Sequence, residues 1–202
     1  MIVDPDTTPP GDLYRFIISV VVPRPIAFVS TIGRDGSHNL APFSYFTALT
    51  NQPPLLGVSI NSRRGQTKDT LRNIEEAGDF VINVVDEALL DRAVEASGEW
   101  PAEVDEFALT GLTPIASERV KSPRVAESPV NLECRLYRVI ELGATHFVIG
   151  EIVRAHVRDE VLTEGRVDPL KLRPVGRLGG EGYAPLREVV QRARPRVSPP
   201  AS

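Results

Sequence analysis

Residues 24–46 read RPIAFVSTIGRDGSHNLAPFSYF, with two strand-like runs on either side of Arg34-Asp35-Gly36. A turn residue followed by glycine suits the positive backbone dihedral angles of a short hairpin loop. The two arms extend over about residues 24–33 and 37–49. This stretch predicts a β-hairpin, and it is the clearest hairpin signal in the chain.

Two longer runs towards the other end of the chain have the same character. They read VNLECRLYRVIEL (130–142) and THFVIGEIVRAHV (145–157), and only Gly143-Ala144 separates them. We therefore expect them to pair as antiparallel neighbours. Shorter strands are expected at residues 55–61 and 80–85.

Helical spacing occurs in two places. One helix is predicted over about Lys68–Ala77 with Gly78 as its C-cap, and another over residues 86–97 behind an Asp86 cap. Residues 98–128 contain scattered prolines and are expected to form a surface excursion with short elements. About six or seven strands with two helices, and no strict β-α-β alternation, favour a mainly β antiparallel barrel with helical insertions over a doubly wound sheet.

The length of 202 residues and the apolar content of 42% fit one compact domain. We expect that domain over residues 12–190. Proline and glycine in residues 1–11, and the composition of residues 191–202, predict flexible segments at both ends. The single cysteine, Cys134, excludes an internal disulfide, and its place within a strand predicts a packed thiol.

Charge and hydropathy exclude several classes of partner. Lys and Arg number 23 against 27 Asp and Glu, for a formal charge of -4, which argues against a nucleic-acid binder. No apolar run is long enough for a membrane span and no secretory signal is visible at the start, so a cytoplasmic protein is expected. His146 and His156 lie ten residues apart on one predicted strand, roughly 33 Å at about 3.3 Å per residue, so we expect no metal site.

The stretch SRRGQTKDTLRNI (62–74) concentrates positive charge at a predicted helix start. Free backbone N–H groups and the helix dipole stabilise a phosphate there, and Arg63, Thr67, Lys68 and Thr70 could complete its coordination. The alternative is a solvated helix face, with Thr67 only capping the helix. Walker A spacing is missing, GRLGGEG (176–182) lacks the dinucleotide fingerprint, and no G-x-S-x-G elbow occurs.

Alternation on the strand 55–61 separates two faces. Leu56, Val58 and Ile60 point one way, while Gly57, Ser59 and Asn61 share the other. The second face is small and polar. Gly57 would let a flat ligand approach the backbone, and the two polar side chains offer hydrogen bonds.

Five separated motifs together resemble the flavin reductase-like family: RPIAFVSTIGRDGSHNLAPFSYF, KDTLRNI, SPVNLECRL, HFVIGEIVRAHV and DPLKLRPVGRLGGEGYA. They cover roughly residues 12–186 in the right order and are most similar to the branch of flavoredoxin and of the reductase components of two-component monooxygenases. The resemblance implies a six-stranded antiparallel Greek-key split barrel that binds FMN near the interface of a homodimer. It also implies NADH or NADPH as co-substrate, with a monooxygenase or an electron-transfer protein as partner.

The resemblance also implies site residues. It places Ser30, Thr31, Asn39 and Ala41 beside the flavin ring, with Pro42, Phe43 and Ser44 along the ring edge. It assigns Ser59, Arg63, Lys68 and Thr70 to the ribityl chain and phosphate, and the small polar face adds Asn61. His146 is similar to a group near the nicotinamide or the ring face, although a surface histidine is the alternative.

Two functions remain open from the sequence. The first is an NAD(P)H-dependent flavin oxidoreductase that passes electrons to free flavin, a monooxygenase partner or oxygen. The second is a non-catalytic FMN-binding electron carrier of the flavoredoxin type, reduced by a protein partner. The loop RPVGRLGGEGYA (173–184) could close the barrel, or Tyr183 could lie against a flavin or a partner subunit.

Overall fold

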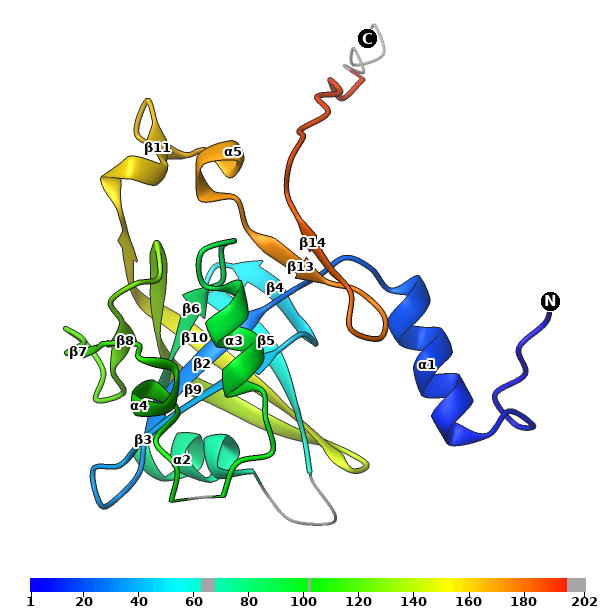
Figure 1. Ribbon diagram of the computed structural model, residues 1–202, viewed down its shortest axis with the longest axis horizontal. Coiled ribbons are helices and arrows are strands. Elements are labelled where there is room, and N and C mark those ends of the chain that lie inside the picture. The colour runs from blue at the N-terminus through cyan, green and yellow to red at the C-terminus, as the bar shows by residue number, and fades with distance from the viewer. Residues whose placement is uncertain (63–67, 102, 196–202) are drawn as a thin grey trace, which may run out of the picture.

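The structure is a computed structural model that describes residues 1–62, 68–101 and 103–195 (Figure 1). Within these residues the largest sheet has seven strands, all paired antiparallel, in the order β3-β2-β6-β9-β10-β5-β4. The strands are β2 (Ala27–Ile32), β3 (His38–Phe43), β4 (Phe46–Asn51), β5 (Pro54–Asn61), β6 (Asp79–Val84), β9 (Val130–Leu142) and β10 (Thr145–Val157).

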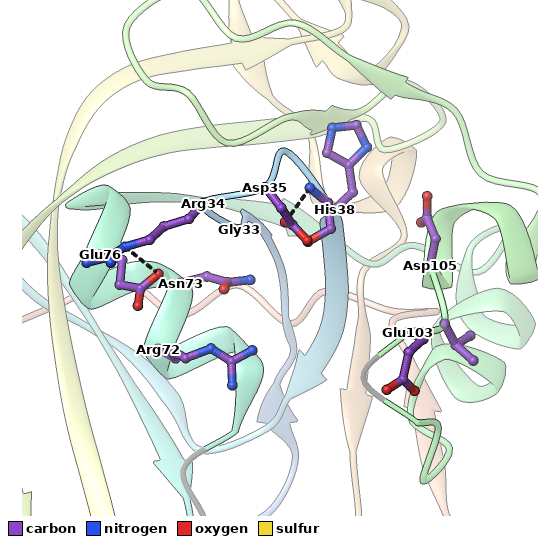
Figure 2. A pocket seen from close by; sticks show the side chains of 11 residues that line it. Gly33, Arg34, Asp35, His38, Arg72, Asn73, Glu76, Glu103 and Asp105 are labelled. Carbon is purple, nitrogen blue, oxygen red and sulfur yellow. Dashed lines mark hydrogen bonds and ion pairs between the residues drawn. The ribbon is translucent and has the colours of Figure 1, made fainter.

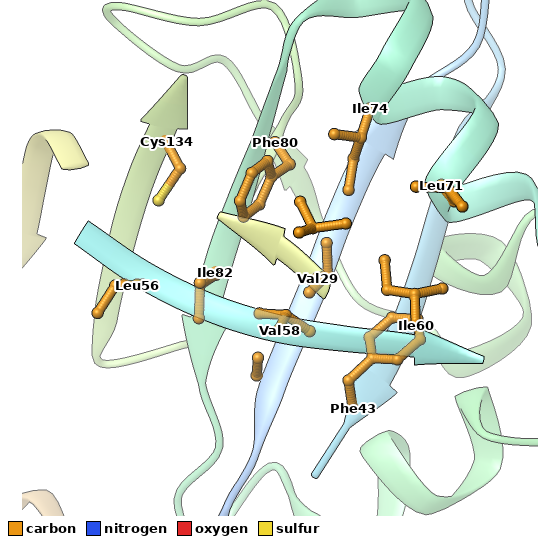
Figure 3. Close-up of a cluster of buried hydrophobic side chains, with 12 residues drawn as sticks. Val29, Phe43, Leu56, Val58, Ile60, Leu71, Ile74, Phe80, Ile82 and Cys134 are labelled. Atoms are coloured by element: carbon orange, nitrogen blue, oxygen red, sulfur yellow. The ribbon is translucent and has the colours of Figure 1, made fainter. Parts of the chain in front are cut away.

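The sheet curls around a core, because β3 at one end also contacts β5 near the other. The predicted antiparallel, mainly β architecture is confirmed. The described strand count of seven agrees with the range read from the sequence and is one more than the resemblance implies. Side chains from every part of the sheet meet inside, among them Val29, Val58 and Phe80, as Figure 3 shows.

Both predicted hairpins are confirmed. Gly36 in the β2–β3 turn has φ +85° and Gly143 in the β9–β10 turn has φ +61°, a region that favours glycine. In the first turn, Asp35 Oδ1 accepts hydrogen bonds from Ser37 N at 3.0 Å and from Ser37 Oγ at 2.6 Å. Turn chemistry that is local in sequence therefore sets the register of both strand pairs.

Helix α2 (Asp69–Ala77) ends at Gly78, whose φ of +74° makes it the predicted C-cap. The helix packs on β2, β3 and β6, and its Leu71 and Ile74 enter the core. Helix α3 (Leu90–Ala96) begins later than predicted, because Asp86 Oδ1 accepts from Leu89 N at 2.9 Å and caps a turn that precedes the helix.

Residues 98–128 form the expected excursion with short elements, α4 (Glu106–Thr110), β7 (Pro114–Ile115) and β8 (Arg124–Val125). Asp105 caps α4 by accepting from Phe107 N at 2.8 Å. Phe107 belongs to a second apolar cluster that joins α3 and α4 to the outer side of β2 and β3. Trp100 closes the end of α3, where its Nε1 donates to Glu95 O at 3.0 Å.

Helix α1 (Pro10–Val20) has no counterpart among the sequence predictions and begins inside the segment 1–11. Figure 1 shows it standing away from the barrel, on the side of a small sheet ordered β1-β13-β14. The remaining short elements are β1 (Arg24–Pro25), η1 (Asp159–Val161), β11 (Leu162–Thr163), β12 (Arg166–Val167), α5 (Pro169–Leu172), β13 (Val175–Arg177) and β14 (Tyr183–Pro185).

The loop around Gly179 joins β13 to β14 and so closes a structured hairpin. The ring of Tyr183 lies against its own chain: Arg177 stands 4.4 Å from the ring centroid, and the ring packs on the second apolar cluster. The Cys134 thiol is fully buried, as predicted, and burial raises its pKa. Among the helices in the described ranges, none combines the length and apolar character needed to cross a membrane.

Candidate functional site

Two amide–hydroxyl pairs attach α2 to the first hairpin. Asn39 Nδ2 on β3 donates to Thr70 Oγ1 at 3.0 Å, and Asn73 Nδ2 donates to Thr31 Oγ1 on β2 at 3.1 Å. Three of the predicted site residues, Thr31, Asn39 and Thr70, therefore belong to one arrangement. It fixes the start of α2 against the ends of two strands.

Lys68 stands at the N-cap position of α2, with its ammonium 5.2 Å from the centre of the Phe43 ring. The structure thus brings Lys68, which is predicted to bind the phosphate, next to Phe43, which is predicted to line the edge of the flavin ring. Among the described residues no side chain caps the helix start, and Leu71 N donates to Lys68 O at 3.0 Å. The N–H groups of a first helical turn have no partner within the helix and are suited to binding an anion. Arg63 and Thr67, predicted for the same socket, lie outside the described residues.

Strand β3 is an edge strand of the main sheet, so one side of its backbone is not paired with another strand. Its predicted residues differ in depth: Ala41 and Pro42 are half-buried, while Phe43 belongs to the core. Ser44 lies in the bend that follows. That bend is tied to β5, since Ser59 N donates to Tyr45 O at 2.8 Å.

On the outer face of β5, Gly57 was predicted to leave room for a flat ligand, and the structure shows no such room. The ring of Phe147 occupies the space above this glycine, and a Cβ added there would lie 2.2 Å from Phe147 Cζ. The flat group against the Gly57 backbone is thus a side chain of the protein, and room for a ligand there is a wrong prediction. Ser59 is half-buried, and Asn61 Oδ1 accepts from Thr145 Oγ1 at 2.7 Å.

Ser30 is placed apart from the other candidates. Its side chain is fully buried; Oγ donates to Pro123 O at 2.5 Å and accepts from Asn83 Nδ2 at 3.0 Å. Asn83 also bonds Phe28 O, Val125 N and Asn131, so the hydroxyl belongs to a buried polar network. This network holds the excursion 98–128 against β2 and β6 and leaves the Ser30 hydroxyl no outward contact.

His146 lies directly opposite Ile60 in the β5–β10 ladder, whereas Phe147 lies opposite Ser59. Because opposite residues share a face, His146 points with the core residue Ile60 and away from the face of Ser59 and Asn61. Its Nδ1 is buried with no hydrogen-bond partner among the described residues. Buried polar atoms are rarely left unpaired, so this nitrogen marks a place where a further partner fits.

A cleft of about 630 Å³ opens beside the Asn39–Thr70 pair (Figure 2). None of the predicted site residues that the structure describes lines it, although His38 is next to Asn39 in the chain and Asn73 is hydrogen-bonded to Thr31. Its rim is charged, and on one side of it Arg34 Nε lies 3.2 Å from Glu76 Oε2 (Figure 2). Hydrogen bonds from Ser37 lower the pKa of Asp35. The lining comes from the β2–β3 loop, from α2 and from the segment before α4, and comprises Gly33, Arg34, Asp35, Ser37, His38, Arg72, Asn73, Glu76, Glu103, Val104 and Asp105.

Glu106 is a residue that sequence reasoning missed. Its Oε2 accepts a hydrogen bond from Leu40 N at 3.1 Å and so covers the free edge of β3 between Asn39 and Ala41. Burial raises the pKa of the Glu106 carboxyl; the N–H of Leu40 opposes that rise, and Asp105 and Asp69 add to it. The signal in the sequence was the Asp105 cap before an apolar run that ends at Gly111, which marks a short helix.

The donor types around the start of α2 fit a phosphate: the ammonium of Lys68, the backbone N–H groups of the first helical turn and the buried hydroxyl of Thr70. The unpaired Nδ1 of His146 is a second polar atom that a bound group could satisfy. In the described ranges, no group of three or more His, Cys, Asp or Glu side chains is placed to hold a metal ion.

Known proteins are similar to this chain in sequence and in fold. The model of the flavin reductase like domain matches residues 19–172. The crystal structure of nitrilotriacetate monooxygenase component B from Bacillus cereus aligns with TM-score 0.92 and 36% identity, covering 95% of this chain and 98% of that one. The Pseudomonas fluorescens 2-nitrobenzoate 2-nitroreductase NbaA aligns with TM-score 0.90 and 32% identity over 100% of both chains.

Flavoredoxin of Desulfovibrio vulgaris (Miyazaki F) is also similar, with TM-score 0.77 and 33% identity over 86% of this chain and 92% of that chain. A flavin reductase with split barrel domain from Shewanella frigidimarina aligns with TM-score 0.84 and 28% identity over 96% of this chain and 99% of that chain, and these matches together confirm the split-barrel fold. With a family model that spans most of its length and these structural relatives, the chain belongs to the flavin reductase-like family.

Proposed function

We propose that this chain binds FMN and catalyses hydride transfer to it from NADH or NADPH. The observation that carries the proposal is the uncapped start of α2, held against the first hairpin by the Asn39–Thr70 and Asn73–Thr31 pairs with Lys68 at its N-cap. An anion at this position gains from the helix dipole and from a charge-assisted hydrogen bond. FMN carries such an anion in its phosphate.

Each group of residues then has a separate task. Lys68, Thr70 and the first amides of α2 hold the phosphate, and Arg63 and Thr67 complete the socket in this proposal. Ser59 and Asn61 hydrogen-bond the ribityl chain. Residues 41–44 offer the edge of β3 to the rim of the flat ring, with Thr31 and Asn39 beside it. Glu106 keeps that edge in place by binding Leu40 N.

The chemistry that FMN supplies when bound is acceptance of a hydride at N5 and onward transfer of electrons. The residues of the chain place the ring and leave a side open for the nicotinamide; none needs to act as an acid or base. We propose His146 as a polar contact near the nicotinamide, reached from the side of β10 that His146 shares with Ile60 and not from the Ser59–Asn61 face, on the strength of its unpaired Nδ1. Electrons then pass to free flavin, to oxygen or to a monooxygenase, and the similarity to monooxygenase component B supports the last. A homodimer completes the proposal.

A non-catalytic electron carrier is the second candidate, supported by the similarity to flavoredoxin. The two functions differ in what reduces the flavin. The test is the anaerobic addition of NADH, and separately of NADPH, to the chain loaded with FMN, while the visible flavin bands are recorded. Prompt bleaching by either nucleotide supports the reductase. Bands that persist with both, but bleach with dithionite, would replace the reductase with the carrier.

A further inference from the structure

The carboxyl group of Glu106 is connected to the start of α2 through β3. Its Oε2 accepts from Leu40 N at 3.1 Å, so it binds the peptide group that joins Asn39 to Leu40. The side chain of Asn39 in turn donates to Thr70 Oγ1 at 3.0 Å, and Thr70 lies in the first turn of α2. Two hydrogen bonds and one residue of β3 therefore link Glu106 to the helix start.

Charge at the start of α2 acts on Glu106. Burial is the main cause of the raised pKa of the Glu106 carboxyl, and repulsion from Asp105 and Asp69 adds to it. Asp105 is the N-cap of α4, whereas Asp69 is the first residue of α2. Water and salt screen partly buried charges less than exposed ones. A further negative group at this helix start would therefore act on Glu106 in the same direction as Asp69.

The other charged groups around α4 are engaged elsewhere or exposed. Arg72 on α2 pairs with Asp69 at 2.5 Å, and Lys68 at the N-cap has its ammonium over an aromatic ring. The His38 ring on β3 packs edge-on against an aromatic ring of α4. The charged side chains of α3 and of the described segment before α4 that are exposed are Asp91, Arg92, Glu95 and Glu103. Of these charged groups, Glu106 is the one that bonds to the backbone of β3 beside the helix start.

We propose that Glu106 is an electrostatic part of the phosphate site, so that flavin binds tightly while its carboxyl is protonated and more weakly once it is ionised. A phosphate monoester carries close to two negative charges near neutral pH and so repels an ionised carboxylate. The coupling is reciprocal, because a bound phosphate then favours the protonated form of Glu106. The inference rests on the proposed FMN site and adds to it a residue that sets the affinity.

Glu106 has a second effect that must be separated from this one. Its bond to Leu40 N also holds the edge of β3, which is proposed to face the flavin ring. Glu106→Gln keeps an acceptor for Leu40 N and removes only the charge. Riboflavin has the ring and the ribityl chain of FMN but no phosphate. A change that acts through the phosphate should therefore be seen with FMN and not with riboflavin.

The test is the equilibrium titration of FMN, and separately of riboflavin, into the flavin-free wild type and Glu106→Gln at a series of pH values. In mildly alkaline solution the variant is expected to bind FMN about threefold to tenfold more tightly than the wild type. The two affinities should converge in acid, where the wild-type carboxyl is protonated as well. Titration of the phosphate itself affects both proteins alike, so the ratio of their affinities cancels it.

Glu103→Gln is the matched control, because it removes the same charge from an exposed position three residues earlier. It should leave the affinity for FMN unchanged at every pH. A measurement on the wild type alone complements the variants: ¹³C NMR of the Glu106 carboxyl carbon, without flavin and with saturating FMN. The carboxyl should titrate at a higher pH in the FMN complex, and absence of the signal from Glu106→Gln assigns it.

The outcomes separate this inference from the proposed function. A ratio of FMN affinities that stays constant with pH, an equal gain for riboflavin, or a Glu106 titration that FMN leaves unchanged would each overturn the inference. In all three cases the wild type still binds FMN, so the proposed function stands. A wild type that binds no FMN would overturn both.

Discussion

Glu106 joins the excursion 98–128 to the edge of β3 through a single carboxylate oxygen. Its raised pKa has a direct consequence for stability. A carboxyl whose folded pKa lies above its unfolded value of about 4.3 favours the protonated folded state, so stability falls as pH rises from the unfolded value through the folded one. Burial of the ionised carboxylate is the main cause.

Glu106→Gln is expected to remove this penalty and keep an acceptor for Leu40 N. At neutral pH the variant should melt at or above the melting temperature of the wild type. It should also lack the fall in melting temperature that the wild type shows between acidic and neutral pH. Thermal melting at a series of pH values measures both. Glu103→Gln, at an exposed position nearby, is the control. A variant that is less stable than wild type only at neutral pH would contradict the account, because the ionised form would then be the stabilising one.

At the scale of elements, Glu133 on β9 holds the loop before β8. Its carboxylate is fully buried and accepts from Glu118 N at 2.9 Å, from Arg119 N at 2.7 Å and from His156 Nε2 at 2.7 Å. Burial by itself would raise the pKa of Glu133, but these hydrogen bonds outweigh it and lower the pKa. The contribution to stability is therefore full above the unfolded pKa and is lost as pH falls through the lower folded pKa.

Glu133→Gln is expected to destabilise the fold by about 3 kcal/mol at neutral pH, since it breaks a buried charged network. The loss should shrink as the pH approaches the folded pKa, where wild type also loses the charge. Urea denaturation at neutral and acidic pH measures it. Glu118→Gln removes a carboxylate that is 55% exposed and should cost less than about 1 kcal/mol. Equal losses of unfolding free energy from Glu133→Gln and Glu118→Gln would contradict the stabilising role of the buried Glu133 carboxylate.

The contact between Phe147 and Gly57 gives another prediction at this scale. Gly57→Ala puts a methyl group where the ring lies, and overpacking of this kind costs about 1–3 kcal/mol. The double variant Gly57→Ala/Phe147→Leu should recover part of that loss. Melting temperatures of the wild type, both single variants and the double variant measure whether the two substitutions compensate each other. Strictly additive losses would show that the ring does not fill this space.

Elements with local signals could be predicted from the sequence. Both hairpins, α2 and its cap at Gly78 follow from residues close together in the chain, and the structure confirms them. Contacts between distant segments could not be predicted. Leu40 meets Glu106 across 66 positions, and Gly57 gives no sign of the phenylalanine that covers it. Helix α1 was missed because the prolines and glycine at its start resemble a flexible segment, and none of its residues is buried in the structure.

For the candidate site, the sequence indicated segments that the structure brings together, but not the contacts that each residue makes. The Asn39–Thr70 and Lys68–Phe43 contacts join residues that motif matching had placed near one ligand. Ser30 turned out to serve a buried network, because the face of a strand residue depends on what packs across it. The orientation of His146 with Ile60 followed only from the strand pairing.

At the scale of the whole molecule, the account requires that one barrel end, closed by α2, holds the phosphate of FMN. The most direct measurement is the equilibrium titration of FMN into the flavin-free wild type, into Lys68→Ala and into the control Lys171→Ala on α5, followed by flavin fluorescence. The account predicts saturable binding by wild type and by the control. Lys68→Ala should bind about tenfold to a hundredfold more weakly, as expected for loss of a hydrogen bond to a charged group. Equal affinity of all three proteins, or no binding by wild type, would contradict it.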